Sequence, residues 1–207
     1  MKKILIAALS LCVPIAANAH EVWIERDGTG PARIYLGEPA EPLPPGGDPE
    51  FAKLTAPTLI GASKPLVRKA GFLEASVPAG DVHAWDDNVF APWGDAGKKE
   101  AVVYYARAGR ASPATRLPFE IAPAAANASR FILTRDGKPL AGTEVTVISP
   151  ARQESKLVTG ADGSFDVAPA GKGRYLLAAA QKDGAATIRG VDAAVVHRIT
   201  TTSFVVN

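Results

Sequence analysis

The stretch Ala16-Ala17-Asn18-Ala19-His20-Glu21-Val22-Trp23-Ile24 combines the end of an export signal with the start of a strand. From residue 20 to residue 25, apolar and polar residues alternate with the two-residue period of a β-strand. Ala17-Asn18-Ala19 has the small-x-small pattern of a signal peptidase site. We therefore expect residues 1–19 to be a signal peptide cleaved after Ala19, with His20 as the first residue of the mature protein.

The residues before this site have the other two parts of a secretory signal. Lys2 and Lys3 supply positive charge, and residues 4–13 form an apolar run that is shorter than the roughly 20 residues a membrane span requires. This pattern predicts a periplasmic protein that does not insert into the membrane after cleavage. Cys12, the single cysteine, lies inside the signal, so the mature chain is expected to have neither disulfides nor thiolate ligands.

Charge and motifs exclude several kinds of function. The chain has 23 Lys and Arg and 21 Asp and Glu, and removing Lys2 and Lys3 leaves 21 of each. A balanced chain has no basic footprint for nucleic acid. No Gly-x-Ser-x-Gly elbow or phosphate-binding loop is present, and the only cysteine is in the signal. We therefore expect a protein that is not an enzyme.

Residues 20–122 are expected to form a first β-rich domain. Its predicted strands are residues 20–25, 33–36, 72–77, 101–107 and 117–121. Residues 38–49 are rich in Pro, Gly and Glu and predict an irregular loop, since proline lacks the donor that a sheet requires. Residues 81–99 combine one histidine with several acids and aromatic rings but have no clean period.

Residues 123–128 predict a linker, and residues 129–207 a second domain. Asp136-Gly137 and Asp162-Gly163 are hairpin-type turns between short alternating runs. Two late strands are expected at residues 193–199 and 200–206. Short strands every 8–12 residues, roughly, are typical of antiparallel sandwiches. The expected fold class is all-β, with two antiparallel β-sandwich (immunoglobulin-like) domains.

Two resemblances follow from particular motifs. Gly137-Lys138-Pro139-Leu140-Ala141-Gly142, the Asp162-Gly163 turn and Gly173-Arg174-Tyr175-Leu176-Leu177 resemble the carboxypeptidase regulatory-like immunoglobulin module. With the initial His20-Glu21-Val22-Trp23 and the closing Thr200-Thr201-Thr202-Ser203-Phe204, the whole chain resembles the periplasmic domain of unknown function 4198 family. That resemblance implies a two-domain β protein associated with nickel or cobalt uptake, working beside a membrane transporter.

His20 is the strongest candidate metal ligand. A free α-amine and an imidazole both release a proton near neutral pH when a metal ion competes, and the amine and Nδ1 of one residue can bind the same ion. Nitrogen from a second histidine would complete a three-nitrogen arrangement that suits Cu(II) and Ni(II). The alternative is that His20 is simply the first residue of a strand.

His83 and His197 are the only other imidazoles. Near His83, aspartates can orient the ring, and Trp85, Phe90 and Trp93 can exclude water from an ion; alternatively, the tryptophans attach an irregular loop to the core. His197 alternates with apolar residues of a late strand, where a histidine is more often a hydrogen-bonded core residue. Glu21 and Glu25 are alternative oxygen ligands, although Glu21 is expected on the opposite face of the strand from His20.

These observations predict a metal-binding protein or an accessory subunit of a metal uptake system, with His20, His83 and His197 as ligands. The ion would be nickel or cobalt by resemblance and copper by ligand chemistry. Two alternatives remain open. One is a metal-free β-sandwich interaction module that docks a receptor or polymer; the other is a copper oxidase resembling lytic polysaccharide monooxygenases, which also begin with histidine.

Overall fold

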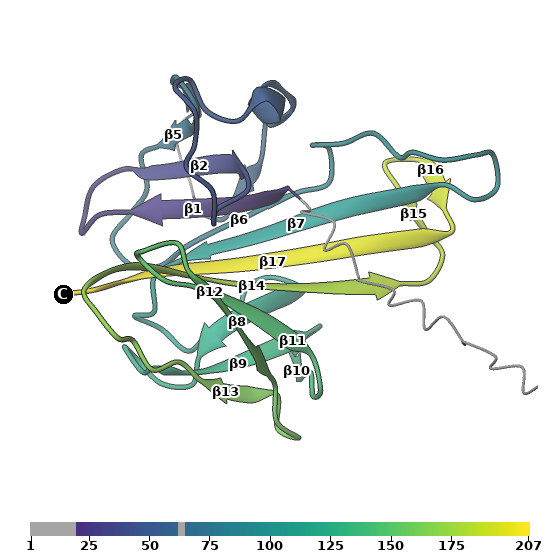
Figure 1. The fold of residues 1–207 in the computed structure, drawn as a ribbon. Helices are drawn as coiled ribbons and strands as arrows, with labels where there is room; N and C mark the ends of the chain where they lie inside the picture. The colour runs from purple at the N-terminus through teal and green to yellow at the C-terminus, as the bar shows by residue number, and fades with distance from the viewer. Residues whose placement is uncertain (1–19, 62–64) are drawn as a thin grey trace, which may run out of the picture.

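A computed structural model describes residues 20–61 and 65–207, so the predicted signal peptide at residues 1–19 lies outside the described residues. The described chain is almost entirely β-structure, with one short 3-10 helix, η1 (Pro49–Lys53). Within this part of the chain, no helix is long and apolar enough to cross a membrane. The expected all-β sandwich fold is confirmed (Figure 1).

Three sheets lie in layers, with the seven-stranded sheet B between the four-stranded sheets A and C. Sheet A contains, in spatial order, β1 (Glu21–Arg26), β2 (Ala32–Gly37), β5 (Leu73–Ala75) and β4 (Val67–Arg68). Sheet B contains β12 (Glu154–Val158), β11 (Glu144–Ile148), β14 (Gly173–Asp183), β17 (Val195–Val206), β7 (Glu100–Ala108), β6 (Val82–Asp86) and β3 (Thr58–Leu59). Sheet C contains β10 (Lys138–Pro139), β9 (Arg130–Arg135) and β13 (Ser164–Asp166), with β8 (Phe119–Pro123) paired to β9. A separate hairpin pairs β15 (Ala186–Ile188) with β16 (Val191–Ala193).

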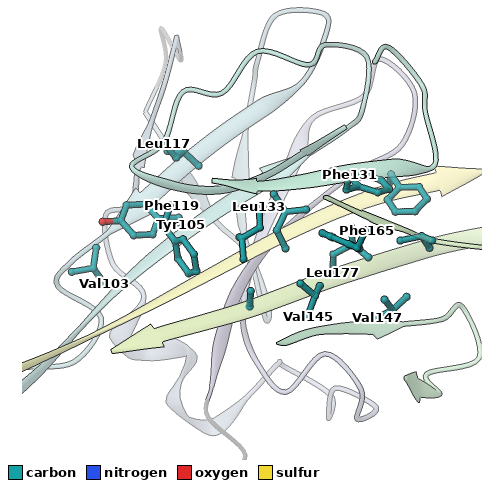
Figure 2. Packing of buried hydrophobic residues seen from close by; sticks show 14 of the residues in the cluster. Val103, Tyr105, Leu117, Phe119, Phe131, Leu133, Val145, Val147, Phe165 and Leu177 are labelled. Atoms are coloured by element: carbon teal, nitrogen blue, oxygen red, sulfur yellow. The ribbon is translucent and has the colours of Figure 1, made fainter. Parts of the chain in front are cut away.

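The layers enclose two hydrophobic cores. Between sheets B and C, Phe131 of β9 packs on Phe204 of β17 at a ring-centroid distance of 5.2 Å, and Tyr175 of β14 stacks on Phe204 at 5.6 Å. Figure 2 shows this core filled by alternate residues of the facing strands. Between sheets A and B, Ile24 and Ile34 pack against the other face of β7. The chain thus forms two sandwiches, as expected, but they share one sheet.

The shared sheet explains why β7 has so little polar character. Every residue from Ala101 to Ala108 is buried, because sheet A covers one face of the strand and sheet C the other. Strands that are buried on both faces are near-continuous apolar runs. β7 and β17 pair in parallel, whereas β17 and β14 are antiparallel.

The sheet crosses the boundary predicted at residues 123–128. Its strands β3, β6 and β7 come from the first expected domain, and β11, β12, β14 and β17 come from the second. Residues 124–129 connect β8 to β9, which pair directly from Phe119 opposite Arg135 to Pro123 opposite Phe131. The segment expected to be a linker is therefore a hairpin connection within sheet C.

Side-chain hydroxyls of β17 fasten strands of both outer sheets to sheet B. Thr201 Oγ1 donates to the Val22 carbonyl of β1 at 2.8 Å, and the Ser203 hydroxyl donates to the Ile24 carbonyl. On the opposite face, Thr202 Oγ1 donates to the Ile121 carbonyl of β8 at 2.7 Å. The three hydroxyl residues are almost completely buried. They satisfy carbonyls that would otherwise be buried at sheet edges without partners.

Replacing Thr201 with valine tests this arrangement. The variant keeps the shape of the side chain but leaves the Val22 carbonyl buried without its donor, so we expect unfolding to become easier by about 1–3 kcal/mol. Thr58→Val, on the exposed edge strand β3, is the matched control and should change stability by less than about 0.5 kcal/mol. Urea denaturation followed by circular dichroism measures both; equal stability of the two variants would contradict the assigned role.

Candidate metal-binding site

A pocket of about 340 Å³ lies between sheets A and B where β1 begins. Two of the three predicted histidine ligands, His20 and His197, line it together. His20 directly precedes β1, and His197 belongs to β17, so residues from the two ends of the described chain meet here. The remaining lining residues are Glu50 of η1, Phe90 and Trp93 of the β6–β7 loop, and Val102 and Tyr104 of β7.

Strand register places His197 in this pocket. In the parallel pairing of β17 with β7, His197 lies opposite Val102 and Ile199 opposite Tyr104. Ile199 and Tyr104 belong to the core between sheets A and B, and side chains two residues apart share a face. His197 therefore faces sheet A at the point where that core opens toward His20.

The ring of His20 is oriented by Asp48, the N-cap residue that directly precedes η1. His20 Nε2 lies 3.2 Å from Asp48 Oδ1, and the same oxygen accepts the backbone N–H of Glu50 at 2.7 Å. Glu50 Oε2 is 3.6 Å from the same ring nitrogen. A carboxylate only accepts, so this contact assigns the imidazole proton to Nε2 and leaves the lone pair on Nδ1. Nδ1 is the nitrogen that can bind one ion together with the α-amine.

A second carboxylate holds His197 in the same way. His197 Nε2 contacts Glu100 Oε2 at 2.5 Å, and the indole of Trp93 stacks on the imidazole at a centroid distance of 5.7 Å. Trp93 and Glu100 also exchange two backbone hydrogen bonds across a β-bridge, of 2.9 and 2.8 Å. Both histidines thus present Nδ1 as the available lone pair, with their orientation fixed by an acid.

Aromatic side chains cover part of the pocket. The Phe90 ring meets the His20 ring edge to face at 6.1 Å, while Trp93 covers His197 and is 42% exposed. Phe90 and Trp93, which were expected around His83, instead lie against His20 and His197, whereas Trp85 lies beside Tyr105 on the other face of sheet B. Burial raises the pKa of Tyr104, which also lines the pocket, so its side chain contributes a neutral hydroxyl.

His83 lies apart from the pocket. It sits on the face of β6 that turns toward sheet C, and its Nε2 is 3.1 Å from Glu120 Oε1. Arg107 donates to Glu120 at 2.7 Å and to Asp81 at 2.6 Å, which completes a buried network of four charged or titratable groups. The structure does not bring His83 together with the other two histidines, and its geometry favours a structural role.

The acidic residues of β1 point away from His20, in line with the strand alternation. Trp23 Nε1 donates to Glu25 at 3.2 Å, and Arg174 pairs with the same carboxylate. Glu21 Oε2 is buried and has no hydrogen-bond partner among the described residues. Burial, together with the charge of Glu154, raises the pKa of Glu21 to about 8, so this carboxyl is largely protonated at neutral pH.

The sequence interpretation missed Asp48, Glu50 and Glu100. A signal for the first was present, because Asp48-Pro49 is the cap-and-first-turn pattern of a helix start. That Asp48 also contacts His20 depends on how the β2–β3 connection folds back over β1, for which the sequence carries no local pattern.

No match was found when the chain was compared with protein-family models, curated proteins and solved structures. The two family resemblances therefore stay predictions. Within residues 20–61 and 65–207, no group of three or more His, Cys, Asp or Glu side chains is arranged to hold a metal ion. A site at this pocket would thus use two imidazoles and a donor of another kind, such as the α-amine of His20.

Glu21→Gln tests the buried neutral carboxyl. A carboxyl whose pKa is raised on folding contributes its full stability below the unfolded pKa of about 4.3 and loses it as pH rises toward about 8. Wild-type stability should therefore fall between pH 5 and pH 8 relative to Glu21→Gln, which cannot ionise. Urea midpoints at several pH values measure the difference; parallel curves for the two proteins would refute the raised pKa.

Glu120→Gln tests the buried network. Burial alone would raise the pKa of Glu120, but hydrogen bonds from His83 and the Arg116 amide, and the charges of His83 and Arg107, hold it below its usual range. The substitution leaves Arg107 without its full counter-charge, so we expect a loss of about 3–5 kcal/mol at pH 7.

The pH dependence gives an independent check. The contribution of Glu120 is present above the unfolded pKa of about 4.3 and is lost as pH falls through the lower folded value. Acidification below about pH 4.3 should therefore destabilise the wild type more steeply than Glu120→Gln. Glu41→Gln, at an exposed position, is the control and should follow the wild type.

Proposed function

We propose that the chain binds a divalent transition metal ion through His20 and His197 and serves as a periplasmic carrier or accessory subunit of a metal uptake system. One observation carries the proposal: two of the three imidazoles line the same pocket, and an acid orients each ring so that Nδ1 is available. No catalytic step is required for this function.

The donor set favours particular ions. Imidazole nitrogen suits copper, nickel and zinc, and the usual order of affinities places Cu(II) above Ni(II) and Co(II). Cleavage after Ala19 would free the α-amine of His20 beside its own Nδ1, giving three nitrogens in total with His197. The amine and the imidazoles must be deprotonated to bind the ion. Protons therefore compete with the metal, and its affinity falls as the pH falls. Nickel or cobalt remains the cargo that the family resemblance implies, with a membrane transporter as the receiving partner.

Isothermal titration with Cu(II), Ni(II) and Co(II) tests the proposal on a chain that begins at His20. His197→Ala should weaken binding by at least about tenfold, since even orienting residues around a metal contribute 10–100-fold to affinity. A chain that begins with an additional methionine should lose affinity to a similar or greater extent, because its α-amine is no longer part of His20. Mass spectrometry of the exported protein establishes the natural first residue.

His83→Gln is the matched control. It removes an imidazole outside the pocket, so metal affinity should be unchanged, although stability should fall because His83 donates to Glu120. Two outcomes would contradict the proposed site. One is equal metal affinity of the chain that begins at His20, the methionine-extended chain, His197→Ala and His83→Gln; the other is loss of binding only in His83→Gln. Absence of any binding would favour the metal-free interaction module.

A further inference from the structure

We propose that a second pocket, on the face of sheet B opposite the candidate metal site, binds a small planar carboxylic acid such as an aryl carboxylate. The pocket has a volume of about 270 Å³ and is lined by Trp85 of β6, Tyr105 of β7 and Arg198 of β17, among others. This inference does not depend on the proposed metal site, because no residue lines both pockets.

Trp85 provides an aromatic wall. Register places it beside Tyr105, on the face of sheet B turned toward sheet C, and it is 36% exposed. The pocket opens near the start of β8, where Leu117 and Pro118 form part of its lining, and Ile188 of the β15–β16 hairpin adds a further apolar side chain. An exposed indole with aliphatic neighbours in a concave site is a stacking surface for one flat ring.

Arg198 provides a fixed cation within the same pocket. Its Nε contacts Asp183, and its Nη1 donates to the Tyr105 hydroxyl at 2.6 Å, so the guanidinium plane is held from two sides. Nη2 has no hydrogen-bond acceptor within the described residues. Asp183 also accepts from Arg135 at 2.7 Å, and Arg135 pairs with Asp136 at 3.0 Å, so these four side chains carry no net charge together. A fixed guanidinium fork matches the geometry of a carboxylate.

Tyr105 adds a second donor. Its oxygen accepts from Arg198, which leaves its own proton free to donate to a ligand. Burial raises the pKa of Tyr105 despite the nearby Arg198 charge, so the hydroxyl keeps this proton at neutral pH. Donors from Arg198 and Tyr105 thus converge on the same pocket.

The remaining charges favour an acid over a neutral sugar. Arg116, on the rim, is exposed and forms no ion pair with the described residues. Asp87, the acid in the lining, is already paired with Arg189 at 3.3 Å. The pocket therefore offers mainly donors and positive charge, whereas a neutral sugar needs acceptors as well. Its volume suits one ring with its acid group.

Calorimetric and saturation-transfer NMR titrations with benzoate at pH 7 and low salt test the inference. We expect saturable benzoate binding with a Kd on the order of 1 mM or tighter. Benzyl alcohol, which lacks the charge, and acetate, which lacks the ring, should each bind at least about tenfold more weakly. Trp85→Ala should weaken benzoate binding by about tenfold. Arg116→Gln, at an exposed position that the fold does not require, should weaken it severalfold and reduce its salt dependence.

Trp93→Ala is the matched control, because it removes another exposed tryptophan on the opposite face of sheet B and should leave benzoate affinity unchanged. The inference would be overturned by absence of saturable benzoate binding up to about 20 mM, far above the expected Kd. It would also be overturned by equal binding of benzyl alcohol, by unchanged affinity in Trp85→Ala, or by binding of glucuronate but not benzoate.

Discussion

The hydrogen bonds from the hydroxyls of Thr201, Thr202 and Ser203 are the constraint on which the layered fold depends. One strand, β17, reaches both outer sheets through consecutive side chains, since residues of a strand point alternately to opposite faces. Thr201 and Ser203 donate to carbonyls of β1, and Thr202 donates to a carbonyl of β8. Without these donors, carbonyls of both strands would be buried without partners, at a cost comparable to a substantial part of the stability of a domain.

The same attachment determines where the candidate metal site forms. Thr201 fixes β1 across β17 immediately after the position of His20, so the residue before the strand lies over the part of sheet B that contains His197. Hydrogen bonds to carboxylates then orient the rings, with Asp48 accepting from His20 and Glu100 accepting from His197. A feature of the core packing therefore brings two histidines together that are far apart in the sequence.

Local patterns predicted much of the fold. The alternation from residue 20 to residue 25 became β1, and Asp136-Gly137 became the turn between β9 and β10, with both residues at positive φ as such turns require. The late strands expected at residues 193–199 and 200–206 are one continuous strand, β17, because nothing between them interrupts the pairing with β14 and β7. The segment without a clean period contains β6, whose His83 belongs to the buried network with Glu120 and Arg107.

The sharing of sheet B had no comparable signal. Parallel pairing of β7 with β17 joins residues that are 95 positions apart in the sequence, such as Glu100 and Val195, and no turn motif marks such a pairing. The buried run of β7 was visible in the sequence, but it fits either one sandwich or the middle of two. For the candidate site, His20 was found because it follows a cleavage pattern. The choice between His83 and His197 depended on which face of sheet B each one occupies.

Electron spin echo spectroscopy of Cu(II) bound to the chain that begins at His20 tests the central claim most directly, because it detects the remote nitrogen of each coordinated imidazole. The shared pocket predicts signals from two inequivalent imidazoles, one of which disappears in His197→Ala while the spectrum of His83→Gln keeps both. A spectrum with a single imidazole that is unaffected by His197→Ala would show that β17 does not deliver a ligand to the site.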